Sequence, residues 1–195
     1  MTSKCKVYLA GPEVFLQNAK EVLDHKLDIC ARMGLDGMIP VDDGIANEQP
    51  TKREMALAIY RGNVLIMDQA DAVIANVTPF RGPHMDPGTA FELGYCSAKG
   101  KIVICYTQQE QDLLERVIRW SGQPTQSVGG RFHDKNGHFI EDFGLKENLM
   151  IESTVDYQGH PMVVSEAPPE QAFVCLLGFE MAAEHLAKLI KKKKA

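Results

Sequence analysis

Short runs of apolar residues alternate along this chain with longer stretches in which apolar residues recur every three or four positions. The short runs predict β-strands, and the longer stretches predict amphipathic helices. Their alternation is typical of a parallel sheet that is covered by helices on both faces. We therefore expect an α/β fold, with a doubly wound, flavodoxin-like parallel sheet flanked by helices and a single domain over residues 1–195.

The expected strands occupy residues 6–10, 36–40, 71–77 and 101–106, and the expected helices occupy residues 14–33, 52–69, 87–98, 110–120 and 170–191. Two helix starts carry clear capping signals. Thr51, with Glu54 three residues later, predicts a capping box. Asp86 is a natural N-cap because Pro87 is favoured in a first helical turn. Residues 42–50 predict a polar loop.

An irregular insertion is expected around residues 121–144, where Gly, Asp, Asn and His dominate. Strand signals in this insertion are short, at residues 131–133 and 138–140. Asn136-Gly137 lies between them and predicts a hairpin with a type I′ turn. We expect this insertion to leave the sheet without forming a separate domain.

Composition narrows the possible functions. Charged residues make up 24% of the chain and the net charge is −5, which argues against nucleic acid as a partner because phosphate binding needs clustered Lys and Arg. The five cysteines show no CxxC spacing, and no His, Cys or Asp cluster has metal-ligand spacing, so no metal is expected. No glycine-rich fingerprint for a dinucleotide or tightly held phosphate is present, and no cofactor is expected. The free thiols and the lack of a signal peptide or long apolar span predict a cytoplasmic protein with no membrane partner.

Ligands of doubly wound sheets bind beyond the carboxyl ends of the strands. This rule selects three candidate site regions, which are the segments 8–15 and 76–92 and whatever follows the strand at 101–106. In the second segment, Asp86 stands at the start of a predicted helix, and the small residues at 88–90 let a ligand approach the backbone. Glu92 follows in the second turn, within reach of whatever Asp86 contacts.

Enzymes of retaining glycosyl transfer typically use two carboxylates that face one cleft and lie about 5 Å apart. The helix N-terminus is expected to lower the pKa of Glu92 and keep it ionised at neutral pH. The pattern also fits a plain cap at Asp86 and a solvated helix face at Glu92. Tyr8 fits either a core position or one that orients a carboxylate, and Arg81 and His84 fit either solvated residues or anion ligands.

Three segments resemble nucleoside 2-deoxyribosyltransferases. They are Tyr8-Leu-Ala-Gly-Pro12 with Phe15, the run from Ala70 to Pro83, and Gly88-Thr-Ala-Phe-Glu-Leu-Gly-Tyr95 with Gly100-Lys101. The resemblance covers roughly the first 106 residues and reappears at Glu147-Asn-Leu-Met150. It implies an enzyme that exchanges the base of 2′-deoxynucleosides through a covalent deoxyribosyl intermediate, with net retention of configuration.

The resemblance also implies the roles of individual residues. Glu92 matches the nucleophile, Tyr8 matches the tyrosine that hydrogen-bonds it, and Asp86 matches the aspartate that binds deoxyribose hydroxyls. Asn148 and Met150 match residues that a neighbouring subunit contributes, which implies a homo-oligomer built from dimers. The substrates are deoxynucleosides and free bases, and the remaining expected contacts are Gly11, Pro12, Phe15, Asn63, Pro79, Phe80, Arg81, Gly82 and Gly88.

One position departs from the family pattern. Asn63 aligns with the aspartate that is assigned to protonating the departing base, and an amide cannot supply a proton. Asp86, another carboxylate such as Asp43, or solvent takes this role instead. Two alternative functions stay open: a 2′-deoxynucleoside 5′-phosphate N-hydrolase, whose phosphate pocket would use Arg81 and His84, and a non-catalytic nucleotide-binding domain.

Overall fold

The computed structural model describes residues 4–40, 50–122 and 126–194. The polar loop predicted at 42–50 therefore falls outside the described residues except for its last position, and so does Asp43. Within the described part of the chain, no helix is long and apolar enough to cross a membrane.

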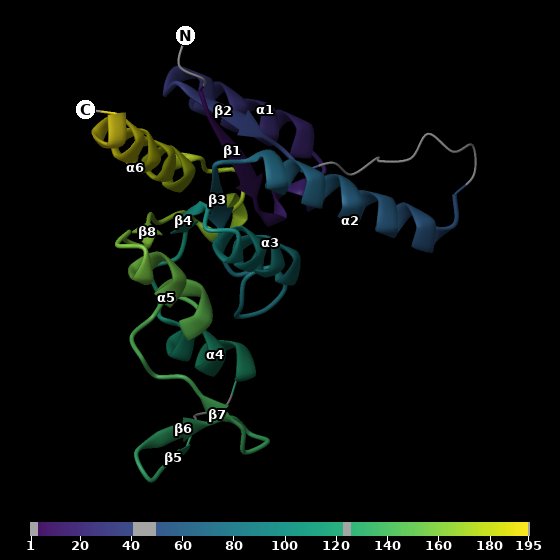
Figure 1. Cartoon of the computed structure of the whole chain (residues 1–195). Coiled ribbons are helices and arrows are strands. Elements are labelled where there is room, and N and C mark those ends of the chain that lie inside the picture. The colour runs from purple at the N-terminus through teal and green to yellow at the C-terminus, as the bar shows by residue number, and fades with distance from the viewer. Residues whose placement is uncertain (1–3, 41–49, 123–125, 195) are drawn as a thin grey trace.

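Five parallel strands form the central sheet, in the order β2-β1-β3-β4-β8 (Figure 1). The strands are β1 (Cys5–Ala10), β2 (Leu35–Met38), β3 (Ala72–Asn76), β4 (Ile102–Thr107) and β8 (Val163–Val164). The chain runs from β1 outward to β2, and then crosses back to β3 on the other side of β1. This strand order is that of flavodoxin-like sheets, and it confirms the predicted fold class.

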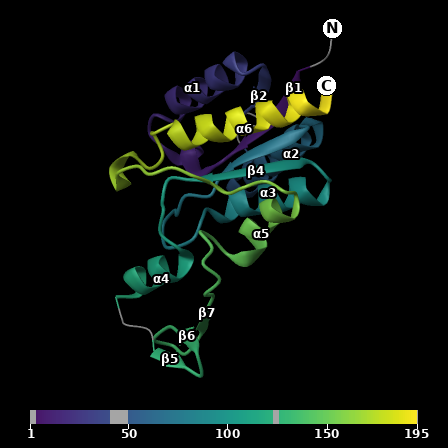
Figure 2. The same cartoon turned by 90° about the vertical axis from the view of Figure 1, so that its left-hand side faces the viewer.

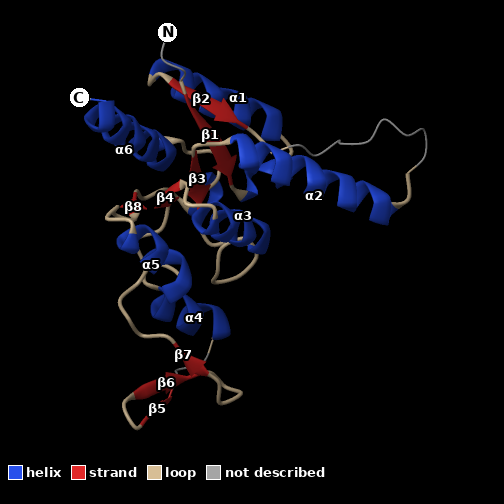
Figure 3. Ribbon diagram, viewed as in Figure 1, coloured by secondary structure: helices blue, strands red, loops and turns tan. Residues whose placement is uncertain are grey.

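Helices cover both faces of the sheet. They are α1 (Ala19–Arg32), α2 (Lys52–Gln69), α3 (Pro87–Ala98), α4 (Leu113–Ser121), α5 (Leu149–Tyr157) and α6 (Leu177–Lys194), with 3₁₀ turns η1 (Pro12–Phe15) and η2 (Pro169–Gln171). Helices α1 and α6 lie on one face, and α3 and α5 lie on the other (Figure 2). A second, antiparallel sheet of β5 (Gln126–Val128), β6 (Arg131–His133) and β7 (Phe139–Ile140) lies beyond α4, away from the main sheet (Figure 3).

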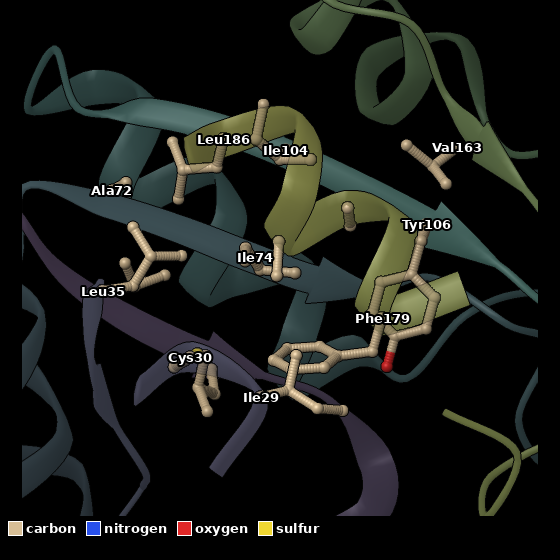
Figure 4. Close-up of a cluster of buried hydrophobic side chains, with 14 residues drawn as sticks. Ile29, Cys30, Leu35, Ala72, Ile74, Ile104, Tyr106, Val163, Phe179 and Leu186 are labelled. Atoms are coloured by element: carbon tan, nitrogen blue, oxygen red, sulfur yellow. The ribbon is translucent and has the colours of Figure 1, made fainter. Parts of the chain in front are cut away.

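Strands β1, β3 and β4 divide their side chains between two hydrophobic clusters, because successive residues of a strand point to opposite faces. Val7 and Leu9 of β1 pack with α1 and α6 in the cluster that Figure 4 shows. Tyr8 and Ala10 point the other way, toward α2, α3 and α5. This alternation places the Tyr8 side chain against α3, the helix that carries Glu92.

The two strongest helix predictions are confirmed to the residue. Helix α2 begins after Thr51, whose side chain and that of Glu54 form the expected capping box. Helix α3 begins after Asp86, whose carboxylate accepts a hydrogen bond from the Thr89 amide. In both helices the capping side chain satisfies an amide that has no partner within the helix.

Other boundaries differ from the prediction. The expected helix at 14–33 is divided into η1 and α1, because Leu16 takes an extended conformation between them. Helices α4 and α6 begin later than expected, at Leu113 and Leu177. The segment before α6 instead forms η2 and a turn, which Gln108 Nε2 anchors by donating to the Cys175 carbonyl. Helix α5 and the strands β5 and β8 were not predicted from the sequence.

The hairpin between β6 and β7 is present, but the predicted type I′ turn is wrong. That turn needs positive φ at both central residues. Gly137 has φ of 82°, whereas Asn136 is not among the described residues with positive φ. Asp134 explains the difference, because its Oδ1 accepts hydrogen bonds from the Asn136 and His138 amides at 2.8 and 2.9 Å. This side-chain contact stabilises a longer turn that closes with Gly137.

Candidate active site

Tyr8 and Glu92 meet between the sheet and α3. Glu92 lies in the second turn of α3, on the side that faces β1, and Tyr8 Oη donates a hydrogen bond to Glu92 Oε1 at 2.5 Å. The Tyr8 side chain is fully buried, and this burial, with the adjacent Glu92 charge, raises the pKa of its hydroxyl. The phenol therefore stays protonated and acts as a donor to the carboxylate.

Burial raises the pKa of Glu92 to about 7, against the lowering that the helix N-terminus was expected to cause. Desolvation disfavours the charged carboxylate and is the largest effect. The Tyr8 hydrogen bond lowers the pKa, and the nearby Asp86 charge raises it further. The prediction of a low pKa was wrong because it considered the helix dipole and not the burial of the side chain.

Asp86 is buried at the start of α3, with one carboxylate oxygen occupied. Its Oδ2 accepts hydrogen bonds from Thr89 N and Thr89 Oγ1 at 2.8 and 3.0 Å. Oδ1 makes no hydrogen bond to any other described residue. Gly88 lies against this carboxylate, since a Cβ at position 88 would lie 3.0 Å from Asp86 Oδ2. The glycine therefore leaves the Asp86 carboxylate and the first turn of α3 accessible.

Three aromatic rings from different parts of the chain gather beside the loop that follows β3. Phe15 and Phe80 stack with their ring centroids 5.4 Å apart, and Phe173 meets Phe80 edge-on at 5.8 Å. The Arg81 guanidinium lies 4.5 Å from the Phe80 ring centroid and 5.1 Å from that of Phe15. Phe15 is 56% exposed, so this stack presents an aromatic and cationic surface to solvent. Arg81 also has φ of 56°, a conformation that non-glycine residues rarely adopt.

A buried ionic network, which the sequence analysis missed, fixes the loop after β1. Glu13 Oε1 accepts hydrogen bonds from Lys26 Nζ, from Asn76 Nδ2 at 2.8 Å and from Tyr106 Oη at 2.9 Å. Glu13 and Lys26 are 2% and 1% exposed. Gly11 is required here, because a Cβ at that position would lie 2.0 Å from Glu13 Oε2. No periodicity marks this network, since Glu13 and Lys26 both look like surface residues in the sequence.

A second buried ion pair, between Glu147 and Arg116, holds the loop that leads into Asp86. Glu147 Oε2 accepts hydrogen bonds from Met85 N at 3.0 Å and from Arg116 Nη2 at 3.2 Å. Its Oε1 contacts His84 Nδ1 at 3.0 Å. Arg116 Nε in turn donates to the Pro83 carbonyl at 2.9 Å. Glu147 therefore occupies Nδ1 of the His84 ring, so this nitrogen is not available for the anion binding that the sequence allowed.

Asn148 follows this ion pair and caps α5. Its side-chain oxygen accepts a hydrogen bond from the Met150 amide at 3.0 Å, and its Nδ2 donates to Glu141 Oε1 at 2.6 Å. Met150 is 70% exposed on the outer surface of α5. The Asn148-to-Met150 segment thus forms a helix start at the surface of its own subunit.

The other predicted contact residues are spread more widely. Pro12 is buried in η1, and Asn63 is half-buried on α2. Pro79 and Gly82 line a cleft beside α4. The described residues contain no group of His, Cys, Asp or Glu side chains that could hold a metal ion.

A protein family and an individual relative match most of this chain. Residues 7–150 match the family model for nucleoside 2-deoxyribosyltransferase. An uncharacterized protein of Schizosaccharomyces pombe is 34% identical over 165 residues, which cover 78% of this chain and 78% of that protein.

Two solved structures are similar. A 2-desoxiribosyltransferase from Leishmania mexicana is 26% identical, with a TM-score of 0.59, and the match covers 87% of this chain and 94% of that one. A conserved protein from Enterococcus faecalis V583 has a TM-score of 0.51 at 18% identity, covering 98% of this chain and 99% of that one. The second likeness supports the fold alone.

Proposed function

Because the chain belongs to the nucleoside 2-deoxyribosyltransferase family, we propose that it exchanges the base of 2′-deoxyribonucleosides through a covalent intermediate on Glu92. The observation that carries this proposal is the hydrogen bond from Tyr8 to the half-buried Glu92 carboxylate, near a second carboxylate at Asp86. Paired carboxylates that flank the reacting bond are typical of retaining glycosyl transfer.

In the proposed first step, a Glu92 oxygen forms a bond to C1′ of the deoxyribose. The bond from C1′ to the base nitrogen breaks, and the base leaves with the electron pair and takes up a proton. In the second step, a ring nitrogen of another base attacks C1′ from the face that the first base vacated, loses a proton and releases Glu92. Two inversions give net retention.

Tyr8 and Asp86 have positioning and binding roles in this proposal. The Tyr8 hydroxyl fixes one Glu92 oxygen, so that the other oxygen is available for attack. Asp86 Oδ1, which has no partner among the described residues, accepts a hydrogen bond from a deoxyribose hydroxyl. Asp86 Oδ2 is held by Thr89, which keeps the carboxylate in place before the substrate arrives.

The aromatic stack is the proposed contact for the base. Phe15 and Phe80 offer flat apolar faces, and Arg81 offers hydrogen-bond donors toward base carbonyls. Stacking tolerates both purines and pyrimidines because every base has an aromatic face. The Asn63 amide suits hydrogen bonding to a base edge, so the proton for the departing base comes from a carboxylate or from water.

We propose that the site is completed by a second copy of the chain, which contributes Asn148 and Met150. Met150 is exposed at the surface, as this role requires. Large apolar side chains are also exposed on α2 and α3, where Tyr60 and Phe91 lie with ring centroids 6.0 Å apart. Leu57 and Leu65 are 45% and 62% exposed on the same helix α2. Association through these helices would remove this apolar surface from water.

Mixing two inactive variants tests whether Asn148 acts across subunits. We expect Glu92→Gln and Asn148→Ala proteins to lack exchange activity separately. Each mixed dimer should regain about half of the wild-type activity, because one of its two sites is intact, and an equimolar mixture that pairs at random should regain about one quarter, because about half of its dimers are mixed. The measurement is exchange activity after the two proteins are mixed, denatured and refolded together. Refolded homogeneous samples are the controls, and no recovery in a verified mixed dimer would place Asn148 in its own subunit's site.

The proposed activity is tested by incubating the protein with thymidine and adenine and following all products by chromatography. Joint appearance of thymine and deoxyadenosine supports exchange, and deoxyinosine replaces thymidine as donor in a second assay.

Release of free sugar phosphate from deoxynucleoside monophosphates, without exchange from any nucleoside, would instead show an N-hydrolase. Arg81 is the residue that favours this alternative, since no described carboxylate forms an ion pair with it. Nucleoside binding without turnover would show a non-catalytic domain.

Replacing Tyr8 by phenylalanine is expected to move the acid limb of the activity profile to higher pH by about one pH unit. The wild-type limb should lie near pH 7, because Glu92 must be deprotonated to attack and burial raises its pKa to about 7. The Tyr8 hydrogen bond lowers this pKa, so its loss raises the pH that ionisation requires. The measurement is kcat/KM for exchange as a function of pH.

Tyr95→Phe is the matched control for this measurement. Tyr95 also lies on α3 and also donates to a carboxylate, at 2.8 Å to Asp68 Oδ1, but away from Glu92. Its profile should match that of the wild type. An acid limb that stays in place or moves to lower pH in Tyr8→Phe would contradict the positioning role of Tyr8.

A further inference from the structure

A cleft of about 350 Å³ lies between α4, the loop after β3 and the segment that precedes α6. Pro79, Gly82 and Pro83 form one wall, and Arg119, Trp120 and Phe173 form the others. None of Tyr8, Asp86 and Glu92 lines this cleft. It is therefore distinct from the carboxylate site, although the loop of residues 79–83 borders it and Phe173, which meets Phe80 edge-on, lies in its wall.

The side chains of this cleft combine aromatic faces with a positive charge. Trp120 is 69% exposed, so its indole ring is available for stacking, and Phe173 contributes a second ring. The exposed Arg119 forms no ion pair with a carboxylate in the described part of the chain. Arg116 also reaches the cleft, but the Glu147 ion pair and two backbone carbonyls already occupy its guanidinium. Arg119 is thus the cation that is available to a ligand.

The polar residues around Arg119 restrict where an anion can lie. Gln109 and Gln111 line the cleft and supply uncharged donors and acceptors. An adjoining hollow of about 300 Å³ shares these glutamines and Arg119 but is also lined by Glu110 and Glu166. These two carboxylates disfavour an anion in the hollow. A bound anion therefore lies on the Trp120 side of Arg119, next to the aromatic rings.

We propose that this cleft binds a nucleoside 5′-monophosphate, with its base stacked on Trp120 and its phosphate on Arg119. The volume is within the range of small-molecule sites. Base stacking on aromatic side chains is favourable for every base, and a guanidinium matches the geometry of phosphate oxygens. The glutamine amides then contact the edge of the base or the sugar hydroxyls. A bound nucleotide would also touch Pro79 and Gly82, in the loop that carries Phe80 and Arg81.

Trp120 provides a direct test, because it is the single tryptophan of the chain. Titration of the whole protein with deoxyadenosine 5′-monophosphate is expected to quench its fluorescence in a saturable manner. Arg119→Gln should weaken this binding about tenfold, since it removes a charge-assisted hydrogen bond to the phosphate. The matched control is Arg32→Gln, which changes an exposed arginine on α1, far along the chain from the cleft. Glu92→Gln should bind with unchanged affinity, which separates this cleft from the carboxylate site.

Two further ligands distinguish a nucleotide site from simpler ones. Deoxyadenosine and inorganic phosphate should each bind at least about tenfold more weakly than the monophosphate, because each makes only part of the contacts. Equal affinity for either of them would overturn the proposal. Unchanged Trp120 emission, or equal binding by Arg119→Gln and wild type, would overturn it as well. These outcomes do not depend on whether the protein exchanges bases.

Discussion

Replacing Glu92 by glutamine is expected to lower the rate of base exchange by at least about 10³-fold while the fold is retained. The glutamine side chain has nearly the same volume, and its carbonyl oxygen can still accept the hydrogen bond from Tyr8. An amide oxygen is a much weaker nucleophile than a carboxylate, so the covalent step is lost. The measurement is the exchange rate between thymidine and adenine, with circular dichroism to verify the fold.

Two controls sharpen this result. Glu21→Gln changes an exposed glutamate in the first turn of α1 and should leave the exchange rate unchanged. Mass spectrometry of wild-type protein that is quenched with a deoxynucleoside donor should find deoxyribose on the peptide that contains Glu92, and no such adduct in the glutamine variant. An active Glu92→Gln protein, or an adduct on another residue, would reject Glu92 as the nucleophile.

Replacing Glu147 by alanine is expected to lower the free energy of unfolding by about 3–5 kcal/mol, because it leaves the Arg116 cation buried without its partner. The side chains of both residues are almost inaccessible, at 4% for Arg116 and 1% for Glu147. The Met85 and Asn148 amides lose their acceptor in the same variant. Urea denaturation followed by circular dichroism measures the effect.

An exposed ion pair provides the comparison for this loss. Asp24 pairs with Lys20 on the surface of α1, where the side chains are 51% and 88% exposed, and Asp24→Ala should cost less than about 1 kcal/mol. The double variant Glu147→Ala, Arg116→Ala should lose less than the sum of the two single variants, since it no longer buries an unpaired charge. Strict additivity would show that the two residues do not act as a pair.

Helix boundaries were predictable from the sequence where the residues at the helix start carry their own capping groups. Helices α2 and α3 were placed to the residue, because Thr51 and Asp86 carry their own capping chemistry. Strand β8 was not predictable from periodicity, since it contains only Val163 and Val164. The division of the expected 14–33 helix and the late start of α6 depend on contacts with distant residues. Gln108, for example, holds the Cys175 carbonyl, and the sequence pattern does not contain this contact.

The contact between Tyr8 and Glu92 was predictable from the sequence, but the electrostatics of this pair were not. The sheet topology places Tyr8 and Glu92 together, and the resemblance implied the same pair. The pKa of Glu92 depends on how deeply the carboxylate is buried, which no sequence spacing reports. The buried ion pair of Glu13 and Lys26 was not predicted for a similar reason, because a buried ion pair has the same sequence signature as a surface one. Glu147 belonged to a recognised motif, and this was the signal that could have drawn attention to it.

The edges of the central sheet limit how copies of this chain can aggregate. β2 has four residues and β8 has two, and these strands form the two edges. An edge strand exposes amide and carbonyl groups that can template pairing with another molecule, and short edges reduce this hazard. We therefore expect concentrated solutions of the folded protein to resist forming fibrils through continuous β-pairing, and contacts between copies to involve helices instead.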